Sequence, residues 1–207
     1  MALLDLIFPP RCGGCGRHGA AWCAVCAAGV RQIPAGTLTG IPLVAAGRLE
    51  GPLQQAIHSY KYRPRPQLAS VLAEPLHGAI VAAGLSLPAL AFVPLHPRRL
   101  RERGFNQAER LATELSRSLG VPLLSGLTRV RATPAQVGLS QAERRLNLEG
   151  AFQWTAAQAP PSGIGLVDDV CTTGATLEAV ARAISEAGGS IGAFLVLAQT
   201  LPAVAVT

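Results

Sequence analysis

From about residue 41, short apolar runs alternate along the chain with longer segments whose apolar residues have helical spacing. The apolar runs are "IPLVAAGRL" (41–49), "ALAFVPL" (89–95), "IGLVDDV" (164–170) and "IGAFLVLAQ" (191–199). They are hydrophobic over most of their length instead of alternating with polar residues. That pattern is typical of strands buried on both faces, as in a parallel sheet.

The segments between these runs have the spacing of helices. We predict helices over 51–62, over 66–84 with a boundary at Pro75, over 105–120, and over Leu177 to Ala187. In the third, Leu111, Leu115 and Leu119 form one stripe and Gly120 is a stop signal. Strands separated by helices predict an α/β domain, with a mostly parallel sheet and helices on both faces.

Residues 127–149, "LTRVRATPAQVGLSQAERRLNLE", break this alternation. The segment is rich in Arg and Gln and its apolar periodicity is weak, so we predict an excursion from the sheet. Connections of that length are often functional.

Two stretches bear on membrane insertion and export. Residues 78–95 carry no charge, but Gly84, Ser86 and Pro88 interrupt them, which favours a helix end, a turn and a buried strand over a membrane span. The start, "MALLDLIFPPRC", has no positive n-region and contains Asp5, so no secretory signal is expected. We therefore expect a cytoplasmic protein without a membrane span.

The composition fits one sizeable core with a small appendage. The chain has 207 residues, 49% of them hydrophobic, and a net charge of +6. Lys61 is the only lysine among its 18 basic residues, which points to compositional bias and weakens the charge as evidence for a partner. The charge still favours an anionic partner, such as nucleic acid or a phosphorylated small molecule.

Four of the five cysteines lie in "CGGCGRHGAAWCAVC": Cys12 and Cys15, then seven residues, then Cys23 and Cys26. Two CxxC turns separated this way predict a tetrahedral structural Zn²⁺ site. Disulfides are disfavoured without an export signal, and a redox CxxC is not normally doubled so closely. An iron–sulfur cluster would use the same four thiolates and is the remaining alternative.

A strand end with two carboxylates and a hydroxyl-rich loop is the second candidate site. Asp168 and Asp169 close an apolar run, and Thr172, Thr173, Gly174, Ala175 and Thr176 follow. Backbone N–H groups, hydroxyls and a helix N-terminus form a phosphate cradle at the end of a parallel strand. The carboxylates suit the two hydroxyls of a ribose, or Mg²⁺ carried with the phosphates.

Two other interpretations of this stretch stay open. The carboxylates could cap the turn while the threonines satisfy local backbone groups. A Mg²⁺ site of a nucleotide hydrolase is the second, but the chain has no GxxxxGK[ST] segment.

"LVDDVCTTGAT" resembles the signature with which type I phosphoribosyltransferases bind phosphoribosyl pyrophosphate (PRPP). With the cysteine block and "HSYKYRPRPQLASVLA", "VPLHPRRLRERGFNQAERLA" and "RATPAQVGLSQAERRLNLEGAF", nearly the whole chain is similar to the ComF-type competence proteins. These are bacterial proteins similar to amidophosphoribosyltransferases and associated with transformation and DNA uptake. "RGFNQ" (103–107) is the most specific piece of the likeness.

The resemblance implies a type I phosphoribosyltransferase fold with a zinc-binding module, residues 1–40, and a phosphoribosyltransferase-like domain, residues 41–207. It implies PRPP with Mg²⁺ as ligand, a pyrophosphate loop at Pro94, Leu95 and His96, and a mobile flap that carries Gln136, Leu139, Arg144 and Asn147. Lys61 and His96 are the only obvious proton-transfer candidates near these motifs, and no general base is identified.

Arg98, Arg99, Arg101 and Arg103 crowd into six positions without making one helical face. They form either a solvated loop or an anion contact, to pyrophosphate oxygens or to the backbone of single-stranded DNA. A platform of aromatics for stacking bases has little support in so few aromatic residues.

Two functions follow from these expectations. One is a protein of DNA uptake that binds PRPP and single-stranded DNA and meets a competence helicase or other competence proteins. The other is an active phosphoribosyltransferase that moves 5-phosphoribose from PRPP to a base or an amine.

Overall fold

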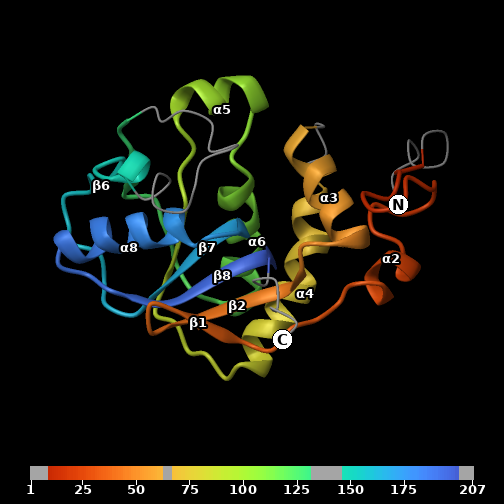
Figure 1. Ribbon diagram of the computed structural model, residues 1–207, viewed down its shortest axis with the longest axis horizontal. Helices are drawn as coiled ribbons and strands as arrows, with labels where there is room; N and C mark the ends of the chain where they lie inside the picture. The colour runs from red at the N-terminus through yellow and green to blue at the C-terminus, as the bar shows by residue number, and fades with distance from the viewer. Residues whose placement is uncertain (1–8, 63–66, 132–145, 201–207) are drawn as a thin grey trace, which may run out of the picture.

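The computed structural model describes residues 9–62, 67–131 and 146–200 (Figure 1). Its centre is a six-stranded sheet in the order β1-β2-β8-β7-β3-β4. The strands are β1 (Gly36–Leu38), β2 (Ile41–Arg48), β3 (Leu90–Phe92), β4 (Leu123–Leu124), β7 (Ile164–Cys171) and β8 (Ile191–Gln199). Only β1 runs antiparallel to its neighbour. The mostly parallel sheet predicted from the apolar runs is confirmed.

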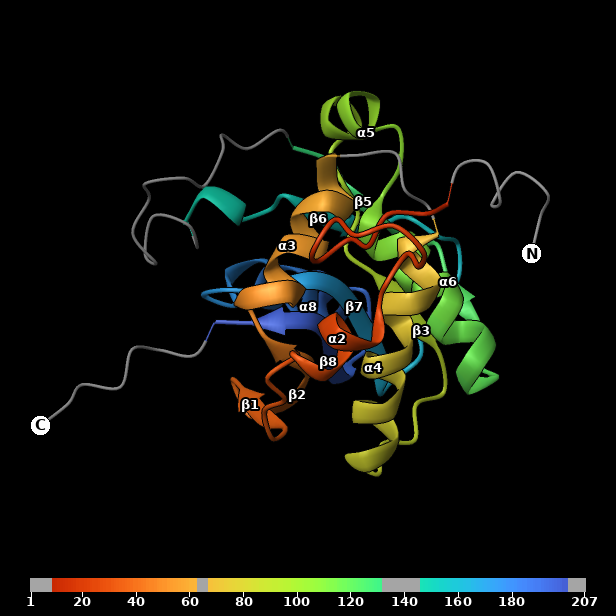
Figure 2. The same cartoon turned by 90° about the vertical axis from the view of Figure 1, so that its right-hand side faces the viewer.

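Helices cover both faces of this sheet (Figures 1 and 2). Helices α3 (Gly51–Tyr62), α4 (Leu68–Ala82) and α6 (Gln107–Leu119) pack on one face, and α8 (Ala175–Glu186) on the other. Alternate residues of β2 serve the two cores: Val44 belongs to the first and Leu43 to the second. The period of two along a strand therefore gives each face its own hydrophobic core.

The predicted excursion is confirmed as well. Strands β5 (Leu127–Arg129) and β6 (Phe152–Trp154) form a separate two-stranded antiparallel sheet. Phe152 and Leu148 pack in the core under α8. The excursion thus begins and ends on a small platform beside the main sheet.

Helix α4 does not break at Pro75, so the predicted boundary is wrong. A proline inside a helix costs about 3 kcal/mol, because it lacks the N–H and its ring crowds the preceding turn. Leu72, Leu76 and Ile80 continue one fully buried stripe across it. Each such side chain stabilises the fold by about 2 kcal/mol, so the stripe outweighs the proline.

The arginine-rich segment is also not a loop. Helix α5 (Pro97–Arg103) begins where the His96 side chain accepts a hydrogen bond from the N–H of Arg98 at 3.2 Å. It ends at Gly104, whose φ of 78° is left-handed. Pro97 suits the first helical position, so local capping rules select the helix although the arginines do not share a face.

The uncharged stretch 78–95 has the predicted parts. Helix α4 ends at Ala82, Gly84 turns with a φ of 65°, and β3 follows at Leu90. Among the described residues, no helix is both long and apolar enough for a membrane span.

Candidate ligand and metal sites

The two carboxylates lie at the carboxyl end of β7, in the middle of the sheet. Lys61, at the end of α3, places its Nζ 3.0 Å from Oδ2 of Asp169, and both side chains are mostly buried. The N–H of Asp169 donates to Oδ1 of Asp168 at 2.8 Å. The pair therefore has a cation on one side and a backbone donor between its members.

Burial raises the pKa of Asp168 to about 7, and the charge of Asp169 adds to the rise. The N–H of Asp169 and the cations Lys61 and Arg129 act in the opposite direction. Two neighbouring carboxylates with limited solvent do not ionise independently. A cationic ligand or a set of hydroxyl donors would stabilise the ionised form of the pair.

The hydroxyl-rich loop follows directly and leads into α8. Gly174 has a φ of 80°, and a Cβ there would lie 2.6 Å from Cδ1 of Leu38 in β1. The Thr200 hydroxyl donates to the Thr172 carbonyl at 3.2 Å. Helix α8 begins at Ala175, so its N-terminus lies just after the end of β7. The N–H of Ala175 donates to the Thr173 hydroxyl at 3.5 Å, so one first-turn donor has a partner within the loop.

Cys171 lies just before this loop and is buried. Burial raises its pKa to about 11, and the charge of Asp168 adds to the rise. At neutral pH it is a protonated thiol, which is a poor nucleophile. Its burial fits a packing role.

The predicted pyrophosphate loop lies beside the carboxylates. Strand β3 pairs with β7 at Phe92 and Val167, and the N–H of Val93 donates to the Val167 carbonyl at 2.9 Å. Pro94 is buried, and Leu95 and His96 are partly buried. The Nδ1 of His96 is occupied by the α5 cap. The structure therefore brings Pro94–His96 and Asp168 to adjacent strand ends.

The motif "RGFNQ" holds this loop in place. The Asn106 amide donates to the Val93 carbonyl at 3.0 Å, while its Oδ1 caps α6 by accepting from the N–H groups of Ala108 and Glu109. The backbone carbonyl of Gln107 accepts a hydrogen bond from the Tyr60 hydroxyl at 3.1 Å. The side-chain Oε1 of Gln107 accepts one from the Arg103 guanidinium, also at 3.1 Å. The motif thus ties α3, α5 and α6 together at the edge of the site.

Arg129 belongs to the same cluster, although no sequence motif points to it. Its guanidinium lies 5.3 Å from the Phe152 ring centroid. Burial lowers its pKa, the positive charge of Arg99 lowers it further, and Asp168 acts in the opposite direction. Arg129, from β5, is therefore within electrostatic reach of both Asp168 and Arg99.

The four arginines of α5 have different neighbours. Arg98 pairs with Glu102 at 3.0 Å on the surface, the charge of Arg99 acts on Arg129, and Arg103 stacks on Tyr62. Arg101 is exposed. The structure does not gather them into one patch, and their predicted role in DNA binding stays a prediction.

Most of the predicted flap lies outside the described residues, which include none of Gln136, Leu139 and Arg144. Asn147 is described: its carbonyl accepts a hydrogen bond from Arg131 at 3.0 Å. Within the part of the chain that the structure describes, its buried Nδ2 has no hydrogen-bond partner.

The four cysteines converge as the sequence predicted. Their sulfur atoms all lie within 4.8 Å of one another. The Sγ atoms of Cys15 and Cys23 are 3.7 Å apart, close to the ~3.8 Å expected between thiolates around a tetrahedral zinc ion. Cys12, Cys15, Cys23 and Cys26 therefore fit a metal ion such as Zn²⁺.

The electrostatics of the cluster also favour a cation. Burial works to raise the pKa of Cys12, but backbone N–H groups, including that of Cys23, bring it down to about 6. Burial raises the pKa of Cys26, and contact with Cys12 raises it further. A divalent metal ion would let all four sulfurs bind as thiolates.

The cysteine cluster packs on the main domain. A Cβ on Gly13 would lie 2.9 Å from Cδ2 of Leu68, and the Ser59 hydroxyl donates to the Gly13 carbonyl at 3.1 Å. A Cβ on Gly14 would lie 2.9 Å from the Trp22 ring, so this tryptophan packs against the cysteine loop. The metal site is thereby attached to α3 and α4.

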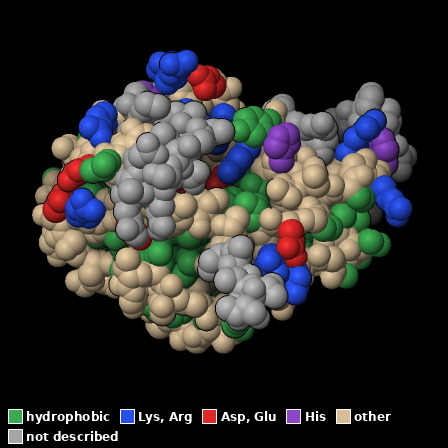
Figure 3. Space-filling view, viewed as in Figure 1, with side chains coloured by type: hydrophobic (Ala, Val, Ile, Leu, Met, Phe, Trp, Pro, Cys, Tyr) green, Lys and Arg blue, Asp and Glu red, His purple; other side chains and the backbone are tan. Residues whose placement is uncertain are grey.

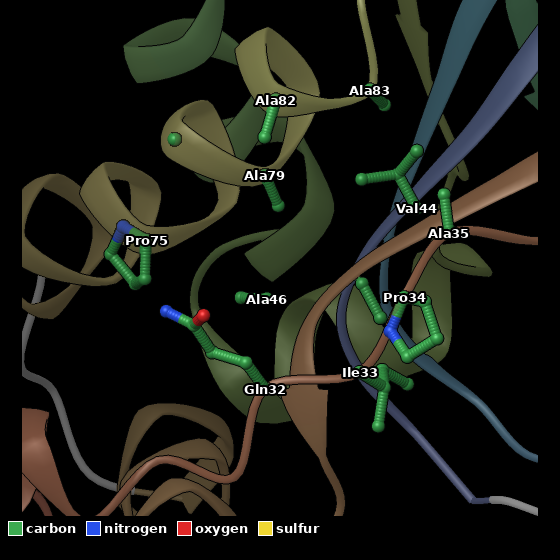
Figure 4. Close-up of a pocket in the computed structure, with 12 residues that line it drawn as sticks. Gln32, Ile33, Pro34, Ala35, Val44, Ala46, Pro75, Ala79, Ala82 and Ala83 are labelled. Atoms are coloured by element: carbon green, nitrogen blue, oxygen red, sulfur yellow. The ribbon is translucent and has the colours of Figure 1, made fainter.

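A cavity of about 450 Å³ lies elsewhere, between α4, residues 32–35 and the middle of β2 (Figure 4). Most of its lining is small and apolar, for example Pro34, Pro75 and Ala79. None of the predicted ligand-binding residues lines it. It contributes nothing to the carboxylate site.

Comparison with known proteins identifies the family. No family model matches the chain. It is 34% identical over 187 residues to competence protein F of Haemophilus influenzae, covering 86% of this chain and 80% of that protein. It is 34% identical over 208 residues to the DNA utilization protein YhgH of Salmonella typhimurium, covering 86% of this chain and 90% of that one.

Two further likenesses are less extensive. Competence protein ComFC of Bacillus subtilis is 36% identical over 107 residues, which is 51% of this chain and 42% of that protein. Among solved structures, adenine phosphoribosyltransferase from Thermoanaerobacter pseudethanolicus matches with a TM-score of 0.45 and 16% identity, over 82% of this chain and 83% of that one. From its two extensive sequence matches, the chain belongs to the family of competence protein F and the YhgH DNA utilization proteins.

Proposed function

We propose that this protein binds PRPP with Mg²⁺ at the carboxyl ends of β3 and β7, and that it handles single-stranded DNA in natural competence or DNA utilisation. One observation carries the proposal: the carboxylate pair Asp168 and Asp169 lies between the hydroxyl-rich loop that leads into α8 and Arg129, whose charge acts on Asp168. This order of charges matches a ribose that has a phosphate on one side and a pyrophosphate on the other.

Each part of PRPP has a candidate partner. The loop Thr172–Thr176 would take the 5-phosphate, and the two carboxylates the ribose hydroxyls. Loop Pro94–His96, with Arg99 and Arg129, would take the pyrophosphate. Guanidinium groups bind such oxygens in bidentate fashion.

Mg²⁺ fits the same site because carboxylate and phosphate oxygens are its preferred ligands. When bound it would neutralise the pyrophosphate, and Asp168 and Asp169 are the residues that would hold it or its water. In the absence of ligand, Lys61 supplies the opposite charge to Asp169. Ligand binding would therefore exchange one cation for another.

The DNA part rests on the relatives. Two of them are named for competence and one for DNA utilization. The basic side chains of α5 are the candidate contacts to a DNA backbone, and a competence helicase is a candidate partner. In this proposal residues 1–40 form a Zn²⁺-stabilised module and residues 41–207 the ligand-binding domain. Of the first range, β1 already pairs with β2 in the main sheet.

A second candidate function is phosphoribosyl transfer. The bond from ribose C1 to pyrophosphate breaks, a bond from C1 to an acceptor nitrogen forms, and the acceptor loses a proton. Arg99 and Arg129 favour this candidate, because stabilising the departing pyrophosphate is the main electrostatic task of such a step. Release of pyrophosphate from PRPP in the presence of an amine or a base would demonstrate it.

The test of the proposed function is calorimetric titration with PRPP and Mg²⁺. Replacing both carboxylates, Asp168→Asn with Asp169→Asn, is expected to abolish binding while zinc content stays unchanged. Glu186→Gln, an exposed change at the far end of α8, is the matched control. Retained affinity in the double variant would refute the ribose assignment.

A further inference from the structure

Tyr62 is an exposed aromatic side chain that directly follows Lys61, the partner of Asp169. The chain has two tyrosines. Tyr60 is fully buried and its hydroxyl donates to Gln107, whereas Tyr62 is 64% exposed at the last position of α3. An exposed tyrosine beside an ion pair gains no core packing from its ring. Its position therefore calls for another explanation.

The ring of Tyr62 is held by two neighbours. The Arg103 guanidinium carbon lies 5.4 Å from its centroid, and the His58 ring lies 4.9 Å away at an angle of 47°. Arg103 is itself held by its hydrogen bond to Gln107 Oε1. Gln107 is buried, so its side chain is a fixed support for the arginine. The aromatic surface is thus braced while most of it stays open to solvent.

A second pair of the same kind lies next to the first. Arg110 lies 5.0 Å from the centroid of Phe105, whose ring is 5.6 Å from that of Tyr60. Phe105 and Arg110 line a polar groove of about 440 Å³ between α5 and α6. The groove also contains Glu109 and Glu114, and Glu114 pairs with Arg117 at 2.8 Å. Aromatic and guanidinium groups therefore recur from the end of α3 to the first turns of α6.

Figure 3 shows hydrophobic, histidine and basic side chains gathered over the upper end of α3, the end that carries Lys61 and Tyr62. Lys61 points to Asp169, and Tyr62 is the next residue. The exposed aromatic ring is therefore carried by the residue that follows the cation partner of Asp169.

We infer that Tyr62, braced by Arg103 and His58, is a stacking platform for a nucleobase of single-stranded DNA, with Arg103 beside the adjoining phosphate. The inference rests on the proposed function for its ligand class and adds the residue that contacts the base. Single-strand binding without sequence preference combines cations along the backbone with aromatic rings on which bases stack. The Tyr62 site supplies both elements within one contact distance.

Stacking a base on an aromatic side chain stabilises a complex by about 1–3 kcal/mol, and every base has a face that can stack. Removing the ring is therefore expected to weaken binding about tenfold without changing the number of phosphates contacted. The loss should depend on the presence of bases in the strand. An arginine that contacts only phosphate would show the opposite pattern.

The experiment measures anisotropy of a labelled oligo-dT and of an abasic oligonucleotide of the same length and charge, with the zinc-loaded protein. For Tyr62→Ala we expect about tenfold weaker oligo-dT binding, unchanged abasic binding and an unchanged slope of log K against log salt. Tyr62→Phe should bind as the unaltered protein does. Val81→Ala, which trims a similarly exposed apolar side chain on α4, is the matched control.

A second variant gives a direct signal. In Tyr62→Trp, oligo-dT is expected to quench the fluorescence of the new indole, while the abasic strand leaves it unchanged. Equal losses on both oligonucleotides, or unchanged oligo-dT affinity in Tyr62→Ala, would overturn the platform. If the unaltered protein bound neither strand, the platform and the DNA half of the proposed function would both fall. A PRPP titration of the same sample would show whether the phosphoribosyl site stands.

Discussion

If the protein binds PRPP and Mg²⁺ as proposed, the carboxylate pair makes that binding depend on pH. The pKa of Asp168 is raised to about 7, and its ionised form is the one that accepts ribose hydroxyls or binds a cation. At pH about 6 roughly one tenth of this carboxyl is ionised, and at pH about 8 roughly nine tenths. Binding is therefore expected to tighten about tenfold over this interval.

Lys61→Gln separates this titration from that of PRPP itself. Lys61 lowers the pKa of Asp168, so its removal should raise that pKa further and move the binding profile to higher pH. If the pKa rises by about 1, the ionised form is disfavoured by about 1.4 kcal/mol more, and its fraction at low pH falls about tenfold. The ratio of Kd values, variant over unaltered protein, should be large at low pH and shrink as the pH rises.

The assay is calorimetric titration with PRPP and excess Mg²⁺ across this pH range, with zinc content checked at each point. The protonation of PRPP itself changes with pH in the same way for both proteins, so it cancels in the ratio of their Kd values. Arg117→Gln removes the same charge from an exposed pair on α6 and should give a ratio near one throughout. A Lys61→Gln ratio that is constant with pH would refute the reasoning, because Lys61 would then not act through ionisation of Asp168.

Three further results are expected. Removing the metal with a chelator, or by Cys26→Ser, should lower the melting temperature and speed amide hydrogen exchange in α3. The reason is that metal binding supplies folding free energy on the order of 10 kcal/mol. Unchanged exchange would mean that the cysteine cluster does not stabilise α3. Replacing Arg98, Arg99 and Arg101 by Ala should weaken single-stranded DNA binding and flatten its salt dependence, and an unchanged slope would remove them from the DNA backbone. Gly174→Ala should lower the free energy of unfolding by about 1–2 kcal/mol in urea titrations, because its φ of 80° is left-handed; equal stability would show that the loop can relax.

The sequence predicts the sheet well because strands buried on both faces carry nearly continuous apolar runs. Runs such as 164–170 and 191–199 correspond to β7 and β8 almost residue for residue. Strands β1, β4, β5 and β6 have two or three residues and lie in no such run, whereas the three-residue β3 lies within the longer apolar run 89–95. Helix α5 escapes a prediction based on spacing because its arginines share no face, and its signals are instead the His96 cap, Pro97 and Gly104.

Some residues of the candidate site could be predicted from the sequence, and others could not. Asp168, Asp169 and the following loop are contiguous, so a local motif reveals them. The sequence marks Lys61 only as a proton-transfer candidate, because its ion pair spans more than one hundred positions and depends on how α3 packs. Arg129 gives no signal, because its proximity to Asp168 exists only after β5 has folded beside the main sheet.

Helix α3 connects the cysteine segment to the candidate ligand site, because the Ser59 hydroxyl donates a hydrogen bond to the Gly13 carbonyl. Ser59 holds the module and Lys61, two residues later, reaches Asp169. One residue inserted between them would turn Lys61 by about 100° around the helix axis and point its ammonium group away from the strand end. A shortened chain that begins at β2 would lose β1 from the sheet and would leave the Ser59 hydroxyl without its acceptor at Gly13. The cysteine segment therefore helps to fix the position of α3, and with it the side chain that pairs with Asp169 at the candidate site.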